Sequence, residues 1–398
     1  MSEKTLRPLS LGTSDFKTLR MRGQIYVDKT NLIYEIAHKA EKFLLIRPRR
    51  FGKSLLVSTF ASLFKEGLKY FSGLAIEKLW DDATYNVVEI DFSKVKGFTD
   101  KASFEKKLCS VVTGSFERAG FSFNEEKENE WIDQISDWMQ SQPNNSLVLL
   151  VDEYDAPQTA SLDNEGLFSE VRRLLSSFYA IIKSNDAALR FVFMTGITKF
   201  NQTGIFSELN NFTDISLNPV FGTLLGYSEE DIKENFAGYL EKAAKILSTP
   251  QEEVLEKLRE NYDGYCFDKN VTSHVYAPWS VLNFFSWLEL GFDNYWMQSG
   301  GKLTLLEKYL HSHSLKAPEE YANEKEVSVE TLEGTADFDE IDDVTLLTQS
   351  GYLTIKRREL DTFFVGFPNK EVASSMASLY ARKLVKKNSL YQAGIVPI

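Results

Sequence analysis

The chain has 398 residues, more than one compact hydrophobic core usually contains, so two or three domains are expected. Hydrophobic residues make up 43% and charged residues 26%, a balance that excludes bulk disorder. The net charge of −12 disfavours a surface built mainly for nucleic acid, because counterion release favours basic surfaces, although a local basic patch stays compatible with it.

The sequence predicts a cytoplasmic location. No apolar run reaches the roughly 18 residues of a membrane span, and residues 1–14 lack the apolar core of a secretory signal. The two cysteines, Cys109 and Cys266, lie far apart and match no metal-binding spacing. A disulfide framework is therefore not expected, and a reducing compartment fits best.

Apolar runs alternate with helical patterns from residue 25 to about residue 220. We predict strands over 25–28, 43–46, 87–92, 147–151, 190–194 and 212–217, and helices over 30–40, 54–68, 103–118 and 170–184. Thr30 is the predicted cap of the first of these helices. Continuous apolar strands that alternate with helices are typical of an α/β domain, with a parallel sheet covered on both faces.

The pattern becomes mostly helical after Tyr227. A helix begins at Ser228, and helical segments continue to about residue 314 with a loop-rich break at 262–278, which predicts a helical lid. We then predict an acidic linker or surface loop at 324–337, a helix at 342–349, strands at 351–355 and 362–367, and a last helix at 371–387. The helix and ribbon suggest a winged-helix-like module. The expected domains are 1–226, 227–320 and 321–398.

Residues 47–54, RPRRFGKS, follow an apolar strand and open a helix, as a phosphate-binding loop does. Backbone N–H groups at a helix N-terminus attract an anion. Lys53 would reach the β- and γ-phosphates, and the Ser54 hydroxyl would bind Mg²⁺. Further nucleotide contacts are predicted for Arg49, Arg50, Phe51, Gly52 and Leu55. The alternative is a chance Gly-Lys-Ser at a strand–helix junction.

The loop departs from the usual pattern at its start. Arg47 stands where glycine is usual, and Pro48 lacks an N–H group. A loop of different shape or greater width is therefore expected. Arg49 and Arg50 could contact phosphate or cover the site.

An acidic pair, Asp152 and Glu153, directly follows the most apolar predicted strand. Buried carboxylates are costly without a nearby cation, and a metal-bound nucleotide would supply one. Asp152 would bind Mg²⁺ together with Ser54, and Glu153 would orient the water that attacks the γ-phosphate. The separation from the loop leaves room for an added strand, as in the ASCE-type P-loop ATPases. A solvated strand end is the alternative.

Several other residues are candidates for supporting roles. Thr195, with Thr198 as second choice, could sense the γ-phosphate, although a structural turn explains both. Tyr26 could stack on adenine with Asp28 nearby, although a core position suits Tyr26 equally. Candidates for an arginine that stabilises the transition state are Arg172, Arg173 and Arg190. We expect His311 and His313 to lie at the surface rather than to bind a metal.

Five segments together resemble the bacterial AAA-ATPase-like family: YVDKT (26–30), RPRRFGKS (47–54), VDEYD (151–155), TGITKF (195–200) and YDGY (262–265). The resemblance covers roughly residues 7–370 and implies ATP and Mg²⁺ as ligands. The departure at Arg47 is shared by that family. Members often carry a C-terminal PD-(D/E)XK nuclease domain, and too few residues follow Glu371 for this chain to be expected to contain one.

We therefore expect a slow Mg²⁺-dependent ATPase whose nucleotide state controls its C-terminal parts, acting as a monomer or small homo-oligomer with a protein partner. The alternative is a weakly hydrolysing, nucleotide-bound scaffold that presents its C-terminal region to protein or nucleic acid. A third hypothesis is DNA binding through the wing residues Lys356, Arg357 and Arg358, which the acidic net charge disfavours.

Overall fold

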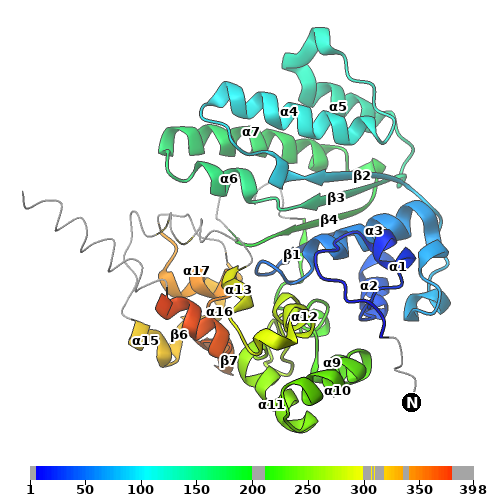
Figure 1. Cartoon of the computed structure of the whole chain (residues 1–398). Coiled ribbons are helices and arrows are strands. Elements are labelled where there is room, and N and C mark those ends of the chain that lie inside the picture. The colour runs from blue at the N-terminus through cyan, green and yellow to red at the C-terminus, as the bar shows by residue number, and fades with distance from the viewer. Residues whose placement is uncertain are drawn as a thin grey trace, which may run out of the picture.

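A computed structural model describes residues 6–199, 211–298, 306, 309, 318–334 and 340–378. Its N-terminal part is a five-stranded parallel sheet in the order β2-β3-β4-β1-β5 (Figure 1). The strands are β1 (Lys42–Ile46), β2 (Asn86–Asp91), β3 (Leu147–Asp152), β4 (Leu189–Gly196) and β5 (Thr213–Asp214). β1 leads into the candidate phosphate loop and β3 into the acidic pair, and β4 lies between these two strands in the sheet. This arrangement is consistent with a P-loop-like fold.

Helices cover both faces of this sheet (Figure 1). One face carries α1 (Phe16–Met21), α2 (Thr30–Ala37) and α3 (Lys53–Glu66), and the other carries α4 (Lys101–Glu117), α5 (Trp131–Gln140), α6 (Ala156–Ser161) and α7 (Glu165–Ser184). Short 3-10 turns join them at Gly67–Tyr70, Ala75–Lys78, Phe92–Lys94, Glu125–Glu130 and Asp186–Ala188.

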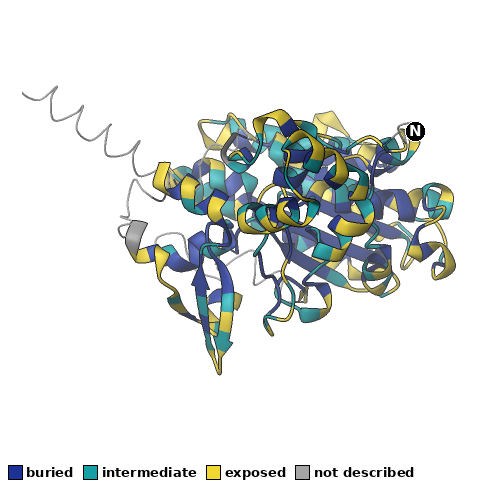
Figure 2. Ribbon diagram, turned by 60° about the horizontal axis from the view of Figure 1, so that its bottom comes forward, coloured by how far each residue is buried: buried dark blue, intermediate teal, exposed yellow. Residues whose placement is uncertain are grey.

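The alternation of side chains along β3 explains the continuous apolar run of this strand. Val148 and Leu150 belong to the core beneath α3, whereas Leu147, Leu149 and Val151 belong to the core beneath α4, α5 and α7. Successive residues of a strand point to opposite faces, so a strand covered on both sides must be apolar throughout. Buried residues accordingly fill the interior of the molecule, with exposed ones on the outer sides of the helices (Figure 2).

Two expectations near the N-terminus are wrong. Residues 24–29 form no strand, and Thr30 is the first residue of α2 rather than its cap. Asp28 caps the helix instead, because its Oδ1 accepts hydrogen bonds from the Thr30 N–H (2.9 Å) and the Thr30 hydroxyl (2.6 Å). An aspartate two residues ahead can satisfy a helix start as well as a hydroxyl at the start itself.

The middle of the chain is helical, as predicted. It contains α9 (Glu229–Asn235), α10 (Ala237–Ile246), α11 (Gln251–Tyr262), α12 (Pro278–Ser286) and α13 (Tyr295–Gln298), with 3-10 turns at Pro219–Phe221 and Leu288–Leu290. Ser228 begins α9 with a capping box that includes Asp231. The predicted break is also present, since residues 263–277 form loops with an isolated bridge between Tyr265 and Val275.

The described residues from 318 to 378 are here called the C-terminal module. It contains α15 (Pro318–Ala322), β6 (Lys325–Ser328), α16 (Val329–Glu333), α17 (Asp343–Gln349), β7 (Thr354–Glu359) and β8 (Thr362–Gly366). Its antiparallel sheet has the order β6-β8-β7. The chain is helical again from 370 to 378, and the rest of the last predicted helix lies outside the described residues.

The acidic linker or surface loop predicted at 324–337 is wrong over residues 325–333. They form β6 and α16, because β6 pairs with β8 and buries Val327 against the module's core. A strand only four residues long with exposed charges on its other side leaves almost no periodicity to detect. None of the helices within the described ranges is long and apolar enough to cross a membrane.

Candidate functional site

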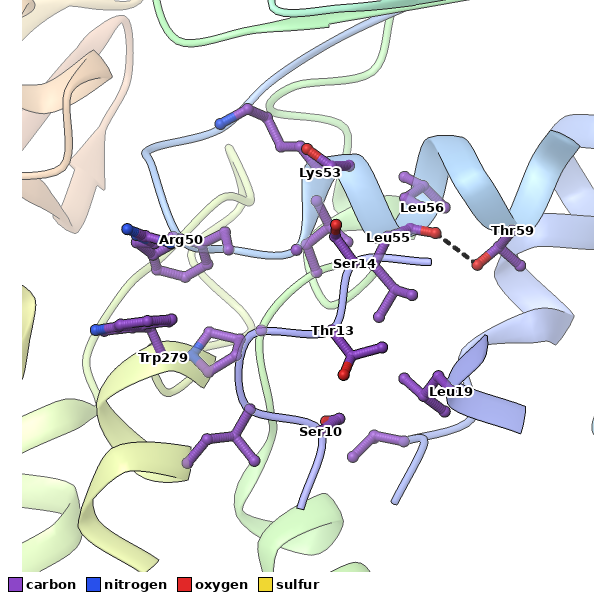
Figure 3. A pocket seen from close by; sticks show the side chains of 18 of the residues that line it. Ser10, Thr13, Ser14, Leu19, Arg50, Lys53, Leu55, Leu56, Thr59 and Trp279 are labelled. Atoms are coloured by element: carbon purple, nitrogen blue, oxygen red, sulfur yellow. Dashed lines mark hydrogen bonds between the residues drawn. The ribbon is translucent and has the colours of Figure 1, made fainter. Parts of the chain in front are cut away.

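A cavity of about 600 Å³ opens beside the predicted phosphate loop (Figure 3). That volume suits a small-molecule ligand. Most of its lining comes from residues 49–56 of the loop and α3, from residues 10, 12–14 and 25–27 near the N-terminus, and from residues 224–227 with Trp279 of the helical region. Ser93, Lys96 and Glu153 also line it, beyond the ends of β2 and β3. Trp279 lies under the Arg50 guanidinium, whose central carbon is 4.1 Å from the ring centroid. Figure 3 shows this stack at one end of the cavity.

The phosphate loop contains two residues in the left-handed region. Gly52, at the N-cap of α3, has a φ of 92°, and Arg50 has a φ of 69°. A loop that alternates between right- and left-handed conformations turns successive N–H groups toward one side, as an anion requires. Glycine adopts the required φ at position 52 without strain, whereas the same region is strained for Arg50. The loop thus enters α3 through two left-handed residues, a geometry compatible with binding an anion.

Lys53 is the first residue of α3, and its side chain is turned back along the loop. Its Nζ donates to the carbonyl oxygens of Arg47 and Pro48, each at 3.0 Å. The side chain is buried, and burial lowers the pKa of the ammonium, while Asp152 and Glu153 act in the opposite direction. The ammonium group therefore lies between the loop and the acidic pair.

Ser54 in the first turn of α3 lies near Asp152 at the end of β3. The Ser54 hydroxyl is near enough to the Asp152 carboxylate to oppose the rise of its pKa, and Asp152 Oδ1 accepts a hydrogen bond from the Glu153 N–H at 3.0 Å. Asp152 is only 8% exposed, and burial raises its pKa. A hydroxyl beside a carboxylate is a pair of hard oxygen donors that Mg²⁺ prefers, and a bound cation would relieve the cost of burying this carboxylate.

Glu153 follows β3 in a strained conformation. Its φ is 51°, in the left-handed region that a residue with a Cβ adopts only at a cost. It lines the cavity, and burial raises the pKa of its carboxyl, against the effect of Lys53. Such strain persists only where the surrounding structure holds the residue in place.

Residues 10–206 match the profile of a family described as a predicted AAA-ATPase. This segment of the chain belongs to the AAA-ATPase-like family. The matched segment includes the phosphate loop, the acidic pair and the end of β4. An uncharacterized protein from the vnfD 5′ region of Azotobacter chroococcum mcd 1 is 29% identical over 376 residues, which are 93% of this chain and 69% of that relative. The similarity therefore extends well beyond the matched ATPase segment.

Of the other residues predicted to contact the nucleotide in this AAA-ATPase-like segment, four line the cavity and Asp28 serves the scaffold. Arg49, Phe51 and Leu55 line the cavity, as does Tyr26, whose ring packs edge-on against Phe16 at 5.1 Å. Asp28 is not among the described residues of the lining. Its Oδ2 accepts from the Ala75 N–H at 2.7 Å, so both carboxylate oxygens join parts of the scaffold. The geometry gives Asp28 a structural role.

The hydroxyls of the two threonine candidates, at the end of β4 and just beyond it, also form hydrogen bonds within the protein. Thr195 is fully buried, its hydroxyl donates to the Leu45 carbonyl at 2.8 Å, and it is not among the described lining residues. The Thr198 hydroxyl donates to Asp155 at 2.9 Å. Neither hydroxyl faces the cavity, and γ-phosphate sensing by Thr195 stays a prediction.

The candidate arginines on β4 and α7 lie away from the cavity. Arg190 lies at the start of β4, opposite the strand ends that carry the site, and it pairs with Asp82 at 2.7 Å. Arg173 pairs with Glu170 at 2.8 Å on the exposed side of α7, the helix that also carries Arg172. His311 and His313 lie outside the described residues.

Arg47 has a role that the sequence did not reveal. Its guanidinium is buried and donates to the carbonyls of Ser216 (2.6 Å) and Phe221 (3.2 Å), and it stacks on Phe267 at 4.3 Å. Burial lowers the pKa of this group. Arg47 therefore joins the end of β1 to the chain beyond β5, and it is directed into the core rather than toward a ligand.

Phe51 anchors the loop on its other side. It is 1% exposed and packs edge-on against Tyr265 (4.8 Å) and Phe267 (5.1 Å). The YDGY segment thus contacts the loop through Tyr265, while Tyr262 belongs to the core of the helical region. The described contacts of these two tyrosines are packing contacts.

The basic residues of the predicted wing are occupied within the chain. Arg357 pairs with Glu324 at 2.8 Å and with Glu359, and it stacks on a phenylalanine ring. Lys356 donates to the Pro368 carbonyl at 3.2 Å. Arg358 donates to the Leu360 carbonyl at 2.8 Å. Of these three charges, the described ion pairs compensate that of Arg357, whereas Lys356 and Arg358 bond to neutral carbonyls.

Proposed function

We propose that this AAA-ATPase-like protein binds Mg·ATP in the 600 Å³ cavity and hydrolyses it slowly. The observation that carries the proposal is the position of Lys53, whose Nζ donates to the carbonyls of Arg47 and Pro48 in the loop while Asp152 and Glu153 act on its charge. An anion-binding loop, a hydroxyl–carboxylate pair and a second carboxylate are the parts that ATP hydrolysis needs.

Binding would begin at the phosphate loop. Backbone N–H groups of residues 50–54 would contact the phosphates, with Lys53 and the exposed Arg49 neutralising their charge. The base would extend toward the aromatic end of the cavity, between Tyr26 and Trp279. Ser54 and Asp152 would hold Mg²⁺, which supplies charge neutralisation on the phosphate oxygens when it is bound.

Hydrolysis would use Glu153. Its carboxylate accepts a hydrogen bond from a water molecule and aligns the water oxygen with the γ-phosphorus. A bond forms between that oxygen and the phosphorus as the bond to the β–γ bridging oxygen breaks, and the water proton passes toward Glu153. Burial raises the pKa of Glu153, which makes the carboxylate a stronger base than an exposed one.

The nucleotide state would control the C-terminal module, because this module contacts the phosphate loop. A Cβ on Gly351 would lie 2.7 Å from the Pro48 side chain, and the Pro48 carbonyl accepts from Lys53. A shift of Lys53 toward phosphate would therefore be felt at the contact with Gly351.

A nucleotide-holding scaffold is the second candidate. It is favoured by the positions of Arg173 and Arg190, which are paired with acidic residues away from the cavity. Such a scaffold would bind ATP tightly and turn it over little without a partner.

The variant Glu153→Gln separates the two candidates. Under the ATPase proposal, turnover falls to background while calorimetric binding of Mg·ATP persists, because the amide keeps the size of the side chain but is a poor base. Glu170→Gln, a surface change on α7, is the matched control and should keep both properties. Wild-type turnover no higher than that of Glu153→Gln would contradict hydrolysis and favour the scaffold.

A further inference from the structure

Asp155 lies two residues after Glu153 and has no part in the proposed chemistry. It is 3% exposed, and its Oδ2 accepts hydrogen bonds from Ile197 N–H (3.1 Å), Thr198 N–H (3.0 Å) and the Thr198 hydroxyl (2.9 Å). Buried carboxylates need such compensation. Asp155 therefore joins the turn that carries Glu153 to the residues at the end of β4 and just beyond it, 196–199, here called the β4 loop.

Tyr154 strengthens the same junction. Its N–H donates to Thr195 O at 3.1 Å, and its hydroxyl donates to Thr198 O at 2.6 Å. Gly196 leaves no space for a side chain, because a Cβ there would lie 2.5 Å from the Tyr154 ring and 2.7 Å from Asp155. The strained Glu153 is thus followed directly by two residues that are fixed to the β4 loop.

Lys199, the last residue of the β4 loop, is fixed to the C-terminal module. It is 4% exposed, its N–H donates to Gln349 Oε1 at 3.0 Å, and its Nζ donates to Glu333 O at 3.2 Å. The same Nζ pairs with Asp214 of β5 at 2.5 Å. Glu333 ends α16 and Gln349 ends α17, so one buried lysine contacts two helices of the module.

These contacts form a continuous series from the candidate catalytic turn to the module. Asp155 and Thr198 supply its first part, and Lys199 with Gln349 supplies its second. Each member is almost fully buried, so water cannot substitute when a bond is lost. A change in how the module docks must therefore either break a buried hydrogen bond or move the β4 loop.

We infer that Asp155 and Lys199 are positioning residues that make the alignment of Glu153 depend on the docked C-terminal module. This inference rests on the proposed ATPase function and adds its regulation. With the module docked, the β4 loop holds the strained turn and hydrolysis proceeds. When the module is released, for instance by a partner, the turn relaxes and hydrolysis slows, whereas ATP binding at the loop persists.

Two variants of the full chain test the inference, Asp155→Asn and Gln349→Met. Each should lower kcat about three- to thirtyfold, the range of coupling along buried networks, and leave the KM for ATP within about twofold. Thr348→Ala is the matched control for Gln349, because the Thr348 hydroxyl bonds within its own helix to Val344 O. A parallel loss of ATP affinity, or an increased kcat, would overturn the inference.

The double variant Asp155→Asn with Gln349→Met distinguishes coupled positioning from two separate structural effects. If both residues act through the β4 loop, the double variant loses less activity than the product of the two single losses. A loss equal to that product would show independent effects and contradict the link. If Gln349→Met does not fold, Lys199→Met takes its place in the cycle.

Hydrogen exchange distinguishes failure of the inference from failure of the proposed function. In the wild type, Mg·ATP should change amide exchange in α17, and in Asp155→Asn this response should be lost. If the protein binds ATP but does not turn it over, hydrolysis is disproved. The response of amide exchange in α17 then still tests the coupling between the site and the C-terminal module. Wild-type exchange in α17 that ignores ATP overturns the link, and no ATP binding at all overturns both.

Discussion

Gly351 lies directly against Pro48, so the C-terminal module rests on the phosphate loop. Gly351 has a φ of 86°, and a Cβ built on it would lie 2.7 Å from the Cβ and 2.8 Å from the Cγ of Pro48. The glycine is required twice, once for its backbone conformation and once for the close approach. The residues that start the loop and the residues that follow α17 are therefore one packed unit.

Gly351→Ala should destabilise the protein more than a glycine substitution with space around it. Gly120 has a φ of 96°, and a Cβ added to it would meet no heavy atom within 4 Å, so Gly120→Ala is the matched control. We expect about 1–2 kcal/mol for the backbone conformation in both variants, and about 1–3 kcal/mol more for overpacking in Gly351→Ala. Urea unfolding measures the difference, and equal losses would contradict the packed contact.

Trp279 should report nucleotide binding. It lines the cavity and stacks under Arg50, so Mg·ATP should alter its fluorescence, and Trp279→Phe should abolish the change. Trp279→Ala should weaken binding about two- to tenfold, the loss expected for one aromatic contact. Trp138→Phe, on α5 across the sheet, is the control that should leave signal and affinity unchanged. A response that survives Trp279→Phe would place the nucleotide elsewhere.

The rate of hydrolysis should decrease as the pH is lowered, and this decrease should begin at a higher pH than it would if Glu153 had the pKa of an exposed glutamate. Burial raises the pKa of Glu153 above its usual 4.5, and the carboxylate must be deprotonated to accept a proton from water. Single-turnover rates measured from about pH 4.5 to about pH 8 would isolate the chemical step. A rate that stays constant down to the acid end of this range would rule out Glu153 as the base.

Glu371 should make stability depend on pH. It is 4% exposed, accepts from Ser280 and from the Trp296 N–H, both at 2.8 Å, and burial raises its pKa to about 7. A carboxyl whose pKa is raised in the folded state stabilises fully below its unfolded value of 4.5, and this contribution disappears as the pH rises to about 7.

The variant Glu371→Gln checks this assignment. Relative to the variant, the wild type should lose up to about 3 kcal/mol of unfolding free energy between about pH 4.5 and about pH 8, at about 1.4 kcal/mol per pKa unit. Chemical denaturation at several pH values measures it. Parallel stability curves for the two proteins would show that Glu371 titrates normally.

The sheet and the core of the site could be predicted from sequence because their signals are local. A strand buried on both faces must be continuously apolar, so Leu147–Val151 and the following Asp152 were recognisable together. The loop at 47–54 was recognisable by its position between strand and helix. The loop and the acidic pair lie near one another because each follows a strand of the same parallel sheet.

The remaining features depend on contacts that the sequence does not display. The acceptors of Arg47 lie 169 and 174 residues away, so its burial could not be foreseen, and a wider loop was expected instead. Asp155 and Lys199 were within recognised motifs, yet their partners lie on the β4 loop and in the C-terminal module. Asp28 bonds to Ala75, a contact that no local pattern encodes.

The most direct test of the account is ATP hydrolysis by the full chain, with and without Mg²⁺, for the wild type and for Lys53→Ala. We predict Mg²⁺-dependent turnover that Lys53→Ala reduces to background, because Lys53 lies between the phosphate loop and the acidic pair. Turnover that persists in Lys53→Ala, or a wild type that neither binds nor hydrolyses ATP, would contradict the assignment of this cavity as an ATP site.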